Sequence, residues 1–198
     1  MSVVSRTFRI VLALAAAAVL AGCAHPISLS TDAAPPQRVD AYLVQKKVAY
    51  AMTEADRAKQ AITPGGGGDR ISYYPYRDLE KSIRDALRAV YQDVVVINSA
   101  ADANAVKASG AAFVFTPVIT TNSSSSSVLT WPPTDFSTEI ACTVTDSAGV
   151  EVTRVKATGK GAAEFSEFKH DLALSAKRAS AEVANQLASE IRRNEKLR

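Results

Sequence analysis

The stretch Leu79–Ile97, LEKSIRDALRAVYQDVVVI, decides the fold because it joins a helical pattern directly to a strand pattern. Its first part repeats apolar residues at helical spacing, at Leu79, Ile83, Leu87 and Val90, with charged residues between them. Its second part ends in a short run of β-branched residues that is typical of a strand. A helix that leads straight into a strand predicts a chain that mixes both kinds of element.

Further patterns of both kinds lie on either side of this stretch. The predicted strands cover residues 43–52, 93–98, 112–121, 136–144 and 150–157, and the predicted helices cover residues 75–90, 100–109 and 171–193. Two main helices on one face of a sheet form a stable two-layer arrangement. We therefore expect a single α+β domain with two layers, in which a mixed or antiparallel sheet of about four to five strands has two main helices packed on one face.

Three local features refine these predictions. Pro117 cannot donate a hydrogen bond to a neighbouring strand, which predicts a sheet edge or a bulge at that point. The alternation of apolar residues breaks between Val152 and Val155, which predicts a bulge near Thr153-Arg154. Asp171 is expected to cap the last helix, whose apolar stripe contains Leu172, Ala176, Ala179, Val183, Leu187 and Ile191.

The segment Pro64–Gly68 interrupts the predicted elements with consecutive glycines. Glycine-rich loops cradle phosphate groups when a Lys and a Ser or Thr follow at the start of a helix. Asp69 follows here instead, and its negative charge would repel an anion. We therefore interpret this segment as a flexible loop or the tip of a hairpin.

The charge of the chain is nearly balanced, with 23 Lys and Arg residues against 20 Asp and Glu residues. A protein that binds nucleic acid needs a clear excess of basic residues to neutralise the phosphates. Nucleic acid is therefore not an expected partner.

The chain has 2 histidines, His25 and His170, and neither belongs to a recognisable nucleophile or metal-ligand pattern. Glu164, Glu167 and Asp171 flank His170, and such a cluster could do acid/base chemistry. A solvated junction between a strand and a helix explains the same residues without chemistry. We expect a protein that is not an enzyme and that binds no metal and no cofactor.

The chain also has 2 cysteines, of which Cys142 lies on the predicted core face of its strand. A redox or nucleophilic thiol needs basic neighbours that lower its pKa, and the sequence around Cys142 supplies none. We therefore expect Cys142 to be a buried and unreactive thiol.

The connection Thr121–Asp135 is the most unusual surface segment that the sequence predicts. A run of serines precedes apolar residues and the only Trp of the chain, which lies beside two rigid prolines. Exposed apolar residues next to polar ones mark contact sites, and the alternative is that Trp131 folds back as a lid on the sheet. On the first hypothesis the residues that contact a partner are Val128, Leu129, Trp131, Pro132 and Pro133.

The N-terminal segment has the order of an export signal. Arg6 and Arg9 precede the uncharged run Ile10–Ala21, which is too short to cross a bilayer. The next residues complete the sequence Leu20-Ala21-Gly22-Cys23, which resembles the lipobox of bacterial lipoproteins at every position. The resemblance implies cleavage before Cys23, a diacylglyceryl group on its sulfur and an acyl chain on its new amino group.

The same resemblance implies a location and a division of the chain. Ala24, rather than Asp, follows the cysteine, which favours the outer membrane, with the outer leaflet of the inner membrane as the alternative. We expect a signal peptide at residues 1–22, a lipidated N-terminus and flexible tether at residues 23–38, and a periplasmic domain at residues 39–198. Such a tether would let the domain stand off the membrane.

The element order is similar to that of several small envelope lipoproteins, among them the lipopolysaccharide-assembly lipoprotein and the auxiliary lipoproteins of transport systems. This similarity implies a non-catalytic, membrane-anchored accessory or scaffold in a cell-envelope assembly or transport complex, with an envelope protein as its partner. One alternative is a periplasmic binder of a small apolar ligand or lipid, held between the sheet and the last helix. A hydrolase is the remaining alternative and is favoured least.

Overall fold

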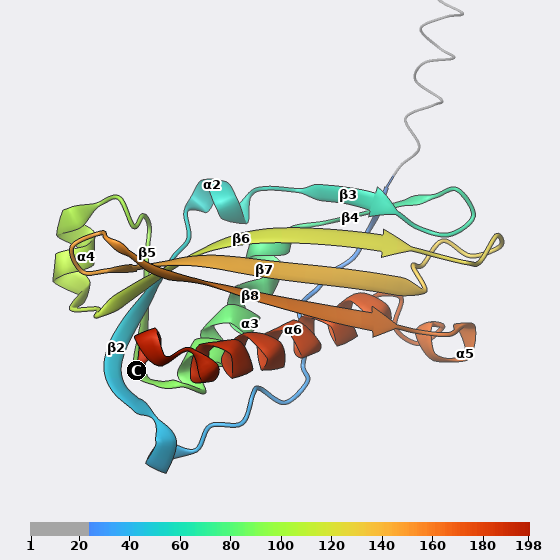
Figure 1. Ribbon diagram of the computed structural model, residues 1–198. Coiled ribbons are helices and arrows are strands. Elements are labelled where there is room, and N and C mark those ends of the chain that lie inside the picture. Colours follow the sequence, from blue (N-terminus) through green and yellow to red (C-terminus); the bar gives the residue numbers. More distant parts are fainter. Residues whose placement is uncertain (1–23) are drawn as a thin grey trace, which may run out of the picture.

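The computed structural model describes residues 24–198, which form one α+β domain (Figure 1). None of the helices in this range has the length and apolar character that a membrane span requires. In chain order the elements are β1 (His25–Pro26), η1 (Asp40–Tyr42), β2 (Val44–Ala51), α2 (Glu54–Arg57), β3 (Ala61–Pro64), β4 (Arg70–Tyr73), α3 (Pro75–Arg88), β5 (Tyr91–Ile97), α4 (Ala103–Ser109), β6 (Phe113–Ser124), β7 (Asp135–Asp146), β8 (Glu151–Ala162), α5 (Phe165–Phe168), α6 (Leu174–Arg193) and η2 (Glu195–Leu197).

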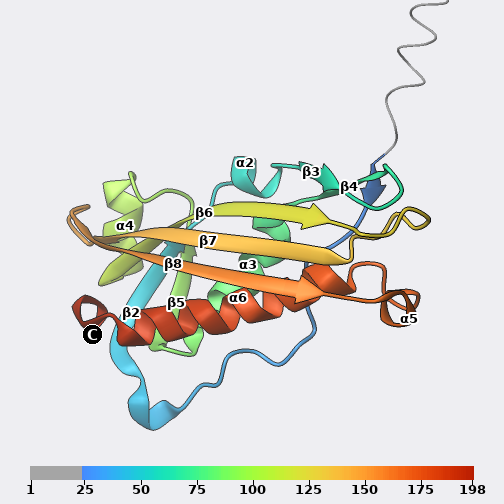
Figure 2. The same cartoon turned by 45° about the vertical axis from the view of Figure 1, so that its right-hand side comes forward.

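The main sheet has 5 strands in the order β5-β2-β6-β7-β8. Strand β2 is parallel to β5 and β6, whereas β6, β7 and β8 form an antiparallel meander, so the sheet is mixed. Helices α3 and α6 lie together on one side of this sheet (Figures 1 and 2). The predicted two-layer α+β domain is confirmed.

Alternate side chains of β2 lie in two different hydrophobic clusters, one on each face of the sheet. Val48 and Tyr50 contribute to the main core under α3 and α6, whereas Ala49 and Ala51 join Val106 of α4 on the other side of the sheet. Neighbouring residues of a strand point to opposite faces, so one strand serves both clusters.

Several local predictions agree with the structure. Strand β2 pairs with β6 only from Phe113 to Phe115. At Pro117 the main sheet therefore has a strand only on the β7 side of β6, so this position is a local sheet edge, as predicted. Gly110 ends α4 in the left-handed conformation. The register of β7 and β8 shifts between Thr153 and Glu151, which places the bulge at Val152, next to the predicted position.

Other local predictions are wrong. Asp171 does not cap α6, because the N-cap position is Ala173, and the Asp171 carboxylate accepts a hydrogen bond from the Ala173 N–H instead. Leu172 precedes the helix and is exposed, so it lies outside the buried stripe. The strand predicted at residues 93–98 is present as β5 at the edge of the sheet, and its Val96 is exposed.

A second sheet of 3 strands, in the order β1-β4-β3, was not predicted. Strands β3 and β4 form an antiparallel hairpin whose tip is the glycine segment, which confirms the hairpin interpretation. Strand β1 lies parallel to β4, with His25 opposite Ile71. Strands this short carry too few residues to show a period of two, which is why the sequence pattern did not reveal them.

The chain after Cys23 is part of this fold rather than a free tether. The Ile27 N–H donates to the Ser72 carbonyl at 2.9 Å, and the Leu29 N–H donates to the Asp78 carboxylate at 3.1 Å. The Leu29 side chain is 0% exposed in the main core. The predicted start of the folded part near Val39 is therefore too late, whereas the predicted signal peptide at residues 1–22 lies outside the described residues.

The backbone of helix α6 packs directly against the backbone of β8 at Gly159 and Gly161. A Cβ added to Gly161 would lie 2.6 Å from the Ala179 amide nitrogen, and one added to Gly159 would lie 2.8 Å from the Val183 Cβ. Contacts this short are not tolerated, so both positions require glycine. The buried alanines of the α6 stripe, Ala176 and Ala179, form the complementary small surface on the helix.

We predict that Gly161→Ala lowers the free energy of unfolding by about 2–3 kcal/mol, because the new methyl group overlaps the α6 backbone. Urea unfolding followed by the fluorescence of Trp131 measures the change. Lys160→Ala, an exposed position on the same strand, is the control and should change stability by less than about 0.5 kcal/mol. Equal stability of Gly161→Ala and the natural chain would contradict the close packing.

Candidate functional site

Two loops from distant parts of the chain meet at one end of the molecule. The Gly66 N–H donates to the Trp131 carbonyl at 2.8 Å, and the Gly67 N–H donates to the Ser127 carbonyl at 3.0 Å. A Cβ on Gly66 would lie 2.8 Å from the Ser125 Oγ and would also overlap the Thr130 carbonyl oxygen. The glycine segment therefore lets the β3–β4 hairpin tip pack directly on the β6–β7 loop.

The serines of the β6–β7 loop hold its shape. The Ser127 Oγ accepts hydrogen bonds from the Thr130 N–H at 3.1 Å and from the Thr130 hydroxyl at 2.8 Å. The Ser125 Oγ accepts one from the Ser127 N–H at 3.1 Å. Hydroxyl side chains that bind nearby backbone groups stabilise turns. The serine run thus folds the loop on itself and leaves its apolar tip in a defined position.

The structure divides the predicted partner-contact residues into two groups. Pro132 and Pro133 are buried, and Trp131 is partly buried against the main core. By contrast, Val128 is 82% exposed and Leu129 is 91% exposed. Of the residues that the sequence proposed as a contact site, only Val128 and Leu129 are therefore freely accessible, and Trp131 supports the loop from below.

Trp131 also joins the loop to the N-terminal segment. Its ring stacks on the ring of His25, with centroids 4.3 Å apart and planes inclined by 14°. The His25 Nε2 lies 3.4 Å from the Asp69 carboxylate at the start of β4. Three segments, the β1 strand, the glycine hairpin and the β6–β7 loop, therefore meet around Trp131.

An apolar groove opens beside this loop. Its volume is 930 Å³, and Leu129 lies on one wall and Phe165 of α5 on another. Phe165 is 63% exposed and contacts Phe168 edge to face, with centroids 5.6 Å apart. The groove is large enough for a small ligand. It does not lie between the sheet and α6, where the sequence predicted a ligand. The α6 backbone packs directly on Gly159 and Gly161 of β8 and leaves no room there.

Two of the three acids around His170, Glu167 and Asp171, are engaged in ion pairs. Glu167 pairs with Arg178 at 2.7 Å, and the hydrogen bonds from this guanidinium lower the pKa of Glu167 to about 2. Burial tends to raise the pKa of Asp171, but Lys177 at 2.8 Å and the Ala173 N–H outweigh it, so the pKa is lowered. Carboxylates held ionised in this way are poor general acids. The solvated junction therefore explains this cluster.

Cys142 is buried in the main core beneath the helices. Burial raises the pKa of its thiol to about 12. Its reactive form, the thiolate, is therefore scarce at neutral pH, as expected for an unreactive core thiol. Within residues 24–198 no group of three or more metal-ligating side chains is close enough to hold an ion.

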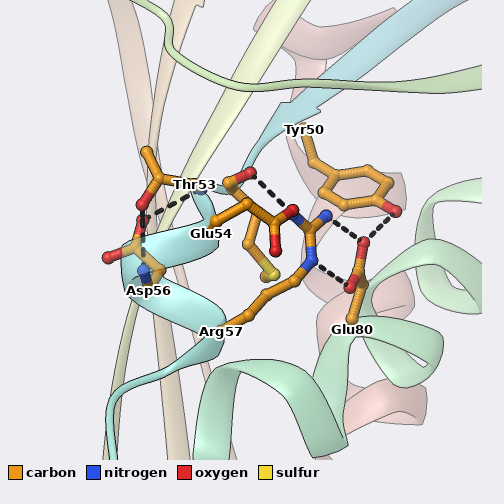
Figure 3. A network of polar contacts seen from close by, with 7 residues as sticks. Tyr50, Thr53, Glu54, Asp56, Arg57 and Glu80 are labelled. Atoms are coloured by element: carbon orange, nitrogen blue, oxygen red, sulfur yellow. Dashed lines mark hydrogen bonds and ion pairs between the residues drawn. The ribbon is translucent and has the colours of Figure 1, made fainter.

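A polar network links β2, α2 and α3 at another part of the domain (Figure 3). The Arg57 guanidinium donates two hydrogen bonds to the Glu80 carboxylate, at 2.7 and 2.8 Å, and the Tyr50 hydroxyl donates to the same carboxylate at 2.9 Å. Burial and the Glu80 carboxylate raise the pKa of Tyr50 to about 12, whereas the Arg57 hydrogen bonds lower the pKa of Glu80.

A capping box completes the network on the α2 side. The Thr53 Oγ1 accepts from the Asp56 N–H at 2.9 Å, and the Asp56 carboxylate accepts from the Thr53 N–H at 3.1 Å. Hydrogen bonds from Lys59 and Thr53 lower the pKa of Asp56 to about 2. The network therefore fixes the one-turn helix α2 against α3 and has a structural role.

No protein-family model matches this sequence, and neither does any curated protein sequence. Among solved structures, a minor lipoprotein from Acinetobacter baumannii has a TM-score of 0.45 and 15% identity, over 76% of this chain and 94% of its own. A DUF330 protein from Xanthomonas campestris has a TM-score of 0.45 and 12% identity, over 85% and 92% of the two chains. A dodecameric variant of PelC from Paraburkholderia phytofirmans has a TM-score of 0.39 and 14% identity, over 78% and 95%. At such TM-scores these similarities do not assign a function.

We predict that Gly66→Ala separates the two loops, because the added methyl group overlaps the Thr130 carbonyl. Trp131 is the only Trp of the chain, so the emission reports on the surroundings of this ring, which also stacks on His25. It should shift to longer wavelength as the ring becomes more exposed to water. Gly149→Ala, in the β7–β8 turn, is the control and should leave the emission unchanged. An unchanged spectrum for Gly66→Ala would show that the loops do not pack as described.

We predict that Glu80→Gln lowers the free energy of unfolding by about 1–2 kcal/mol at neutral pH, since it removes the negative charge that pairs with the Arg57 guanidinium. The pKa of Glu80 is depressed by folding, so the contribution of Glu80 is present above the pKa of the unfolded chain and is lost as the pH falls through the folded pKa. The difference between the two proteins should therefore shrink in acid.

Urea unfolding across a pH series measures both effects of Glu80→Gln. Glu54→Gln is the matched control, because Glu54 pairs with the same arginine but its side chain is 87% exposed. It should cost less than about 0.5 kcal/mol. A Glu80→Gln penalty that stays constant down to low pH would contradict the assignment to the ion pair.

Proposed function

We propose that this chain is a lipid-anchored, non-catalytic lipoprotein of the bacterial envelope that serves as an accessory or scaffold in an assembly or transport complex. The observation that carries the proposal is the sequence Leu20-Ala21-Gly22-Cys23 at the end of an apolar export signal. Cys23 lies outside the described residues, and its lipidation remains a prediction. Two or more acyl chains on Cys23 would hold the protein stably on a membrane.

The arrangement of the reactive side chains supports a non-catalytic role. His25 is stacked on Trp131, Glu167 and Asp171 near His170 are paired with Arg178 and Lys177, and Cys142 is buried. Each of these groups has a structural role that accounts for its position. A hydrolase is therefore the least favoured of the three hypotheses.

The proposed location is the outer membrane, with the domain in the periplasm. The residue after Cys23 is Ala24, and the outer leaflet of the inner membrane remains the alternative. The proposed partner is an envelope protein, and nucleic acid is not expected because the chain carries 23 basic against 20 acidic residues.

Binding of a small apolar ligand or lipid remains a second candidate function, because the groove beside α5 has a volume of 930 Å³ and is lined by Leu129, Phe165 and Phe168. Phe165→Ser would weaken such binding without touching the anchor. A lipid that co-purifies with the natural chain but not with this variant would favour the second candidate.

We predict that Cys23→Ala abolishes the incorporation of radiolabelled palmitate, because it removes the sulfur that would carry the diacylglyceryl group. The variant should also leave the membrane fraction on cell fractionation. Cys142→Ala is the control and should retain both label and location, since Cys142 is buried in the core. Palmitate labelling of Cys23→Ala equal to that of the natural chain would overturn the anchor.

A further inference from the structure

The start of the described chain lies at the same end of the domain as three exposed apolar side chains, Val128, Leu129 and Phe165. In Figures 1 and 2 the chain enters beside β4, at the end where the β6–β7 loop and α5 project. His25 stacks on Trp131, only two positions from Leu129 in sequence. This end is opposite the β7–β8 turn, because the two strands run along the whole length of the sheet.

The link between the anchor position and this end is short. Only Ala24 separates Cys23 from His25, which is already paired with β4 and stacked on Trp131. Two steps between consecutive Cα atoms span at most about 7–8 Å. A lipid on Cys23 would therefore hold this end of the domain at the membrane surface, whereas the 23–38 tether predicted from sequence would have let the domain stand away from it.

The side chains at this end suit a membrane interface. Val128 and Leu129 are 82% and 91% exposed, and Phe165, which lines the same groove as Leu129, is 63% exposed. The glycine hairpin and the serine hydrogen bonds hold the loop that carries Val128 and Leu129. Apolar side chains fixed in this way can enter the boundary between headgroups and acyl chains without a loss of internal packing.

The charges at this end are mixed. Asp69 is followed by Arg70 at one side, and Glu164 lies near Lys169 at the other, all of them exposed. A surface with both signs gains little from the negative headgroups of a bilayer. Contact with the membrane should therefore depend on apolar insertion and should change little with salt.

We infer that the domain sits directly on the bilayer, with Val128, Leu129 and Phe165 inserted into its interfacial layer beside the lipid anchor. The inference rests on the proposed function, because it requires lipid on Cys23. A lipid surface is the favoured occupant because the short link keeps it next to these side chains at a high effective concentration. The loop that the sequence assigned to a partner thereby becomes a membrane contact.

Site-specific quenching tests this orientation. The full, lipidated protein carries Leu129→Cys labelled with an NBD fluorophore and is reconstituted into vesicles of phosphatidylethanolamine and phosphatidylglycerol with doxyl-labelled lipid. Leu129 is 91% exposed, so the label displaces no packed side chain. Val150→Cys, next to the opposite β7–β8 turn and 62% exposed, is the matched control. The natural chain, whose Cys142 is buried, measures background labelling.

The expected result is loss of most of the emission at position 129, little loss at position 150, and no change when salt is added. Equal quenching at the two positions, or no quenching at position 129, overturns the inference. A label at position 129 that is covered by a protein instead of by lipid also overturns it. The mass of the same preparation reports lipid on Cys23 separately. Lipidated protein without quenching refutes the orientation alone, whereas protein without lipid refutes the proposed function.

Discussion

The docking of the segment after Cys23 onto β4 and α3 is the constraint on which the placement of the domain depends. Leu29 fills a site in the main core, its N–H donates to the buried Asp78 carboxylate, and the Ser30 hydroxyl donates to the Asp78 carbonyl. These contacts tie the N-terminal segment to the first turn of α3. The proposed anchor on Cys23 would therefore be joined closely to the folded domain instead of through a flexible linker.

The main sheet and helix α6 support the end of the molecule where the β6–β7 loop lies. Strands β6, β7 and β8 are 12 residues long each and extend the sheet from the α4 side to the β6–β7 loop. Helix α6 is held on β8 through the glycines at 159 and 161, and the Ser175 hydroxyl at its start donates to the Pro133 carbonyl at 2.8 Å. The sheet, the last helix and the loop therefore form one support, and the exposed residues project from its end.

Elements that carry their own periodic pattern were predictable from the sequence. The helix at Pro75–Arg88 shows an apolar stripe, and the strand at Asp135–Asp146 shows regular alternation, so each pattern identifies its element without its neighbours. The α+β class and the burial of Cys142 follow from the same patterns. The apolar stripe of α6 identifies this helix in the same way, because Ala176, Ala179, Val183, Leu187 and Ile191 are all buried.

The features that depend on a partner in space were not predictable. Residues His25 to Ser30 look like an extended tether because Leu29 is the one fully buried residue among them and only Ile27 joins it, partly buried, against the core. The glycines at 65 and 66 look like flexible chain until the Trp131 and Thr130 carbonyls are placed beside them. The sequence left Trp131 open between a lid and a contact residue, and its packing on the main core and its stack on His25 identify it as a support for the loop.

Amide hydrogen exchange of the lipidated protein at Ile27 and Leu29 tests the central claim most directly. Both amides donate to the folded domain, Ile27 to the Ser72 carbonyl and Leu29 to the Asp78 carboxylate. The account predicts that they exchange as slowly as the amides of β4, because the segment opens only when that strand opens. Exchange at the rate of an unstructured chain would show a free tether and would contradict the placement of the domain on the membrane.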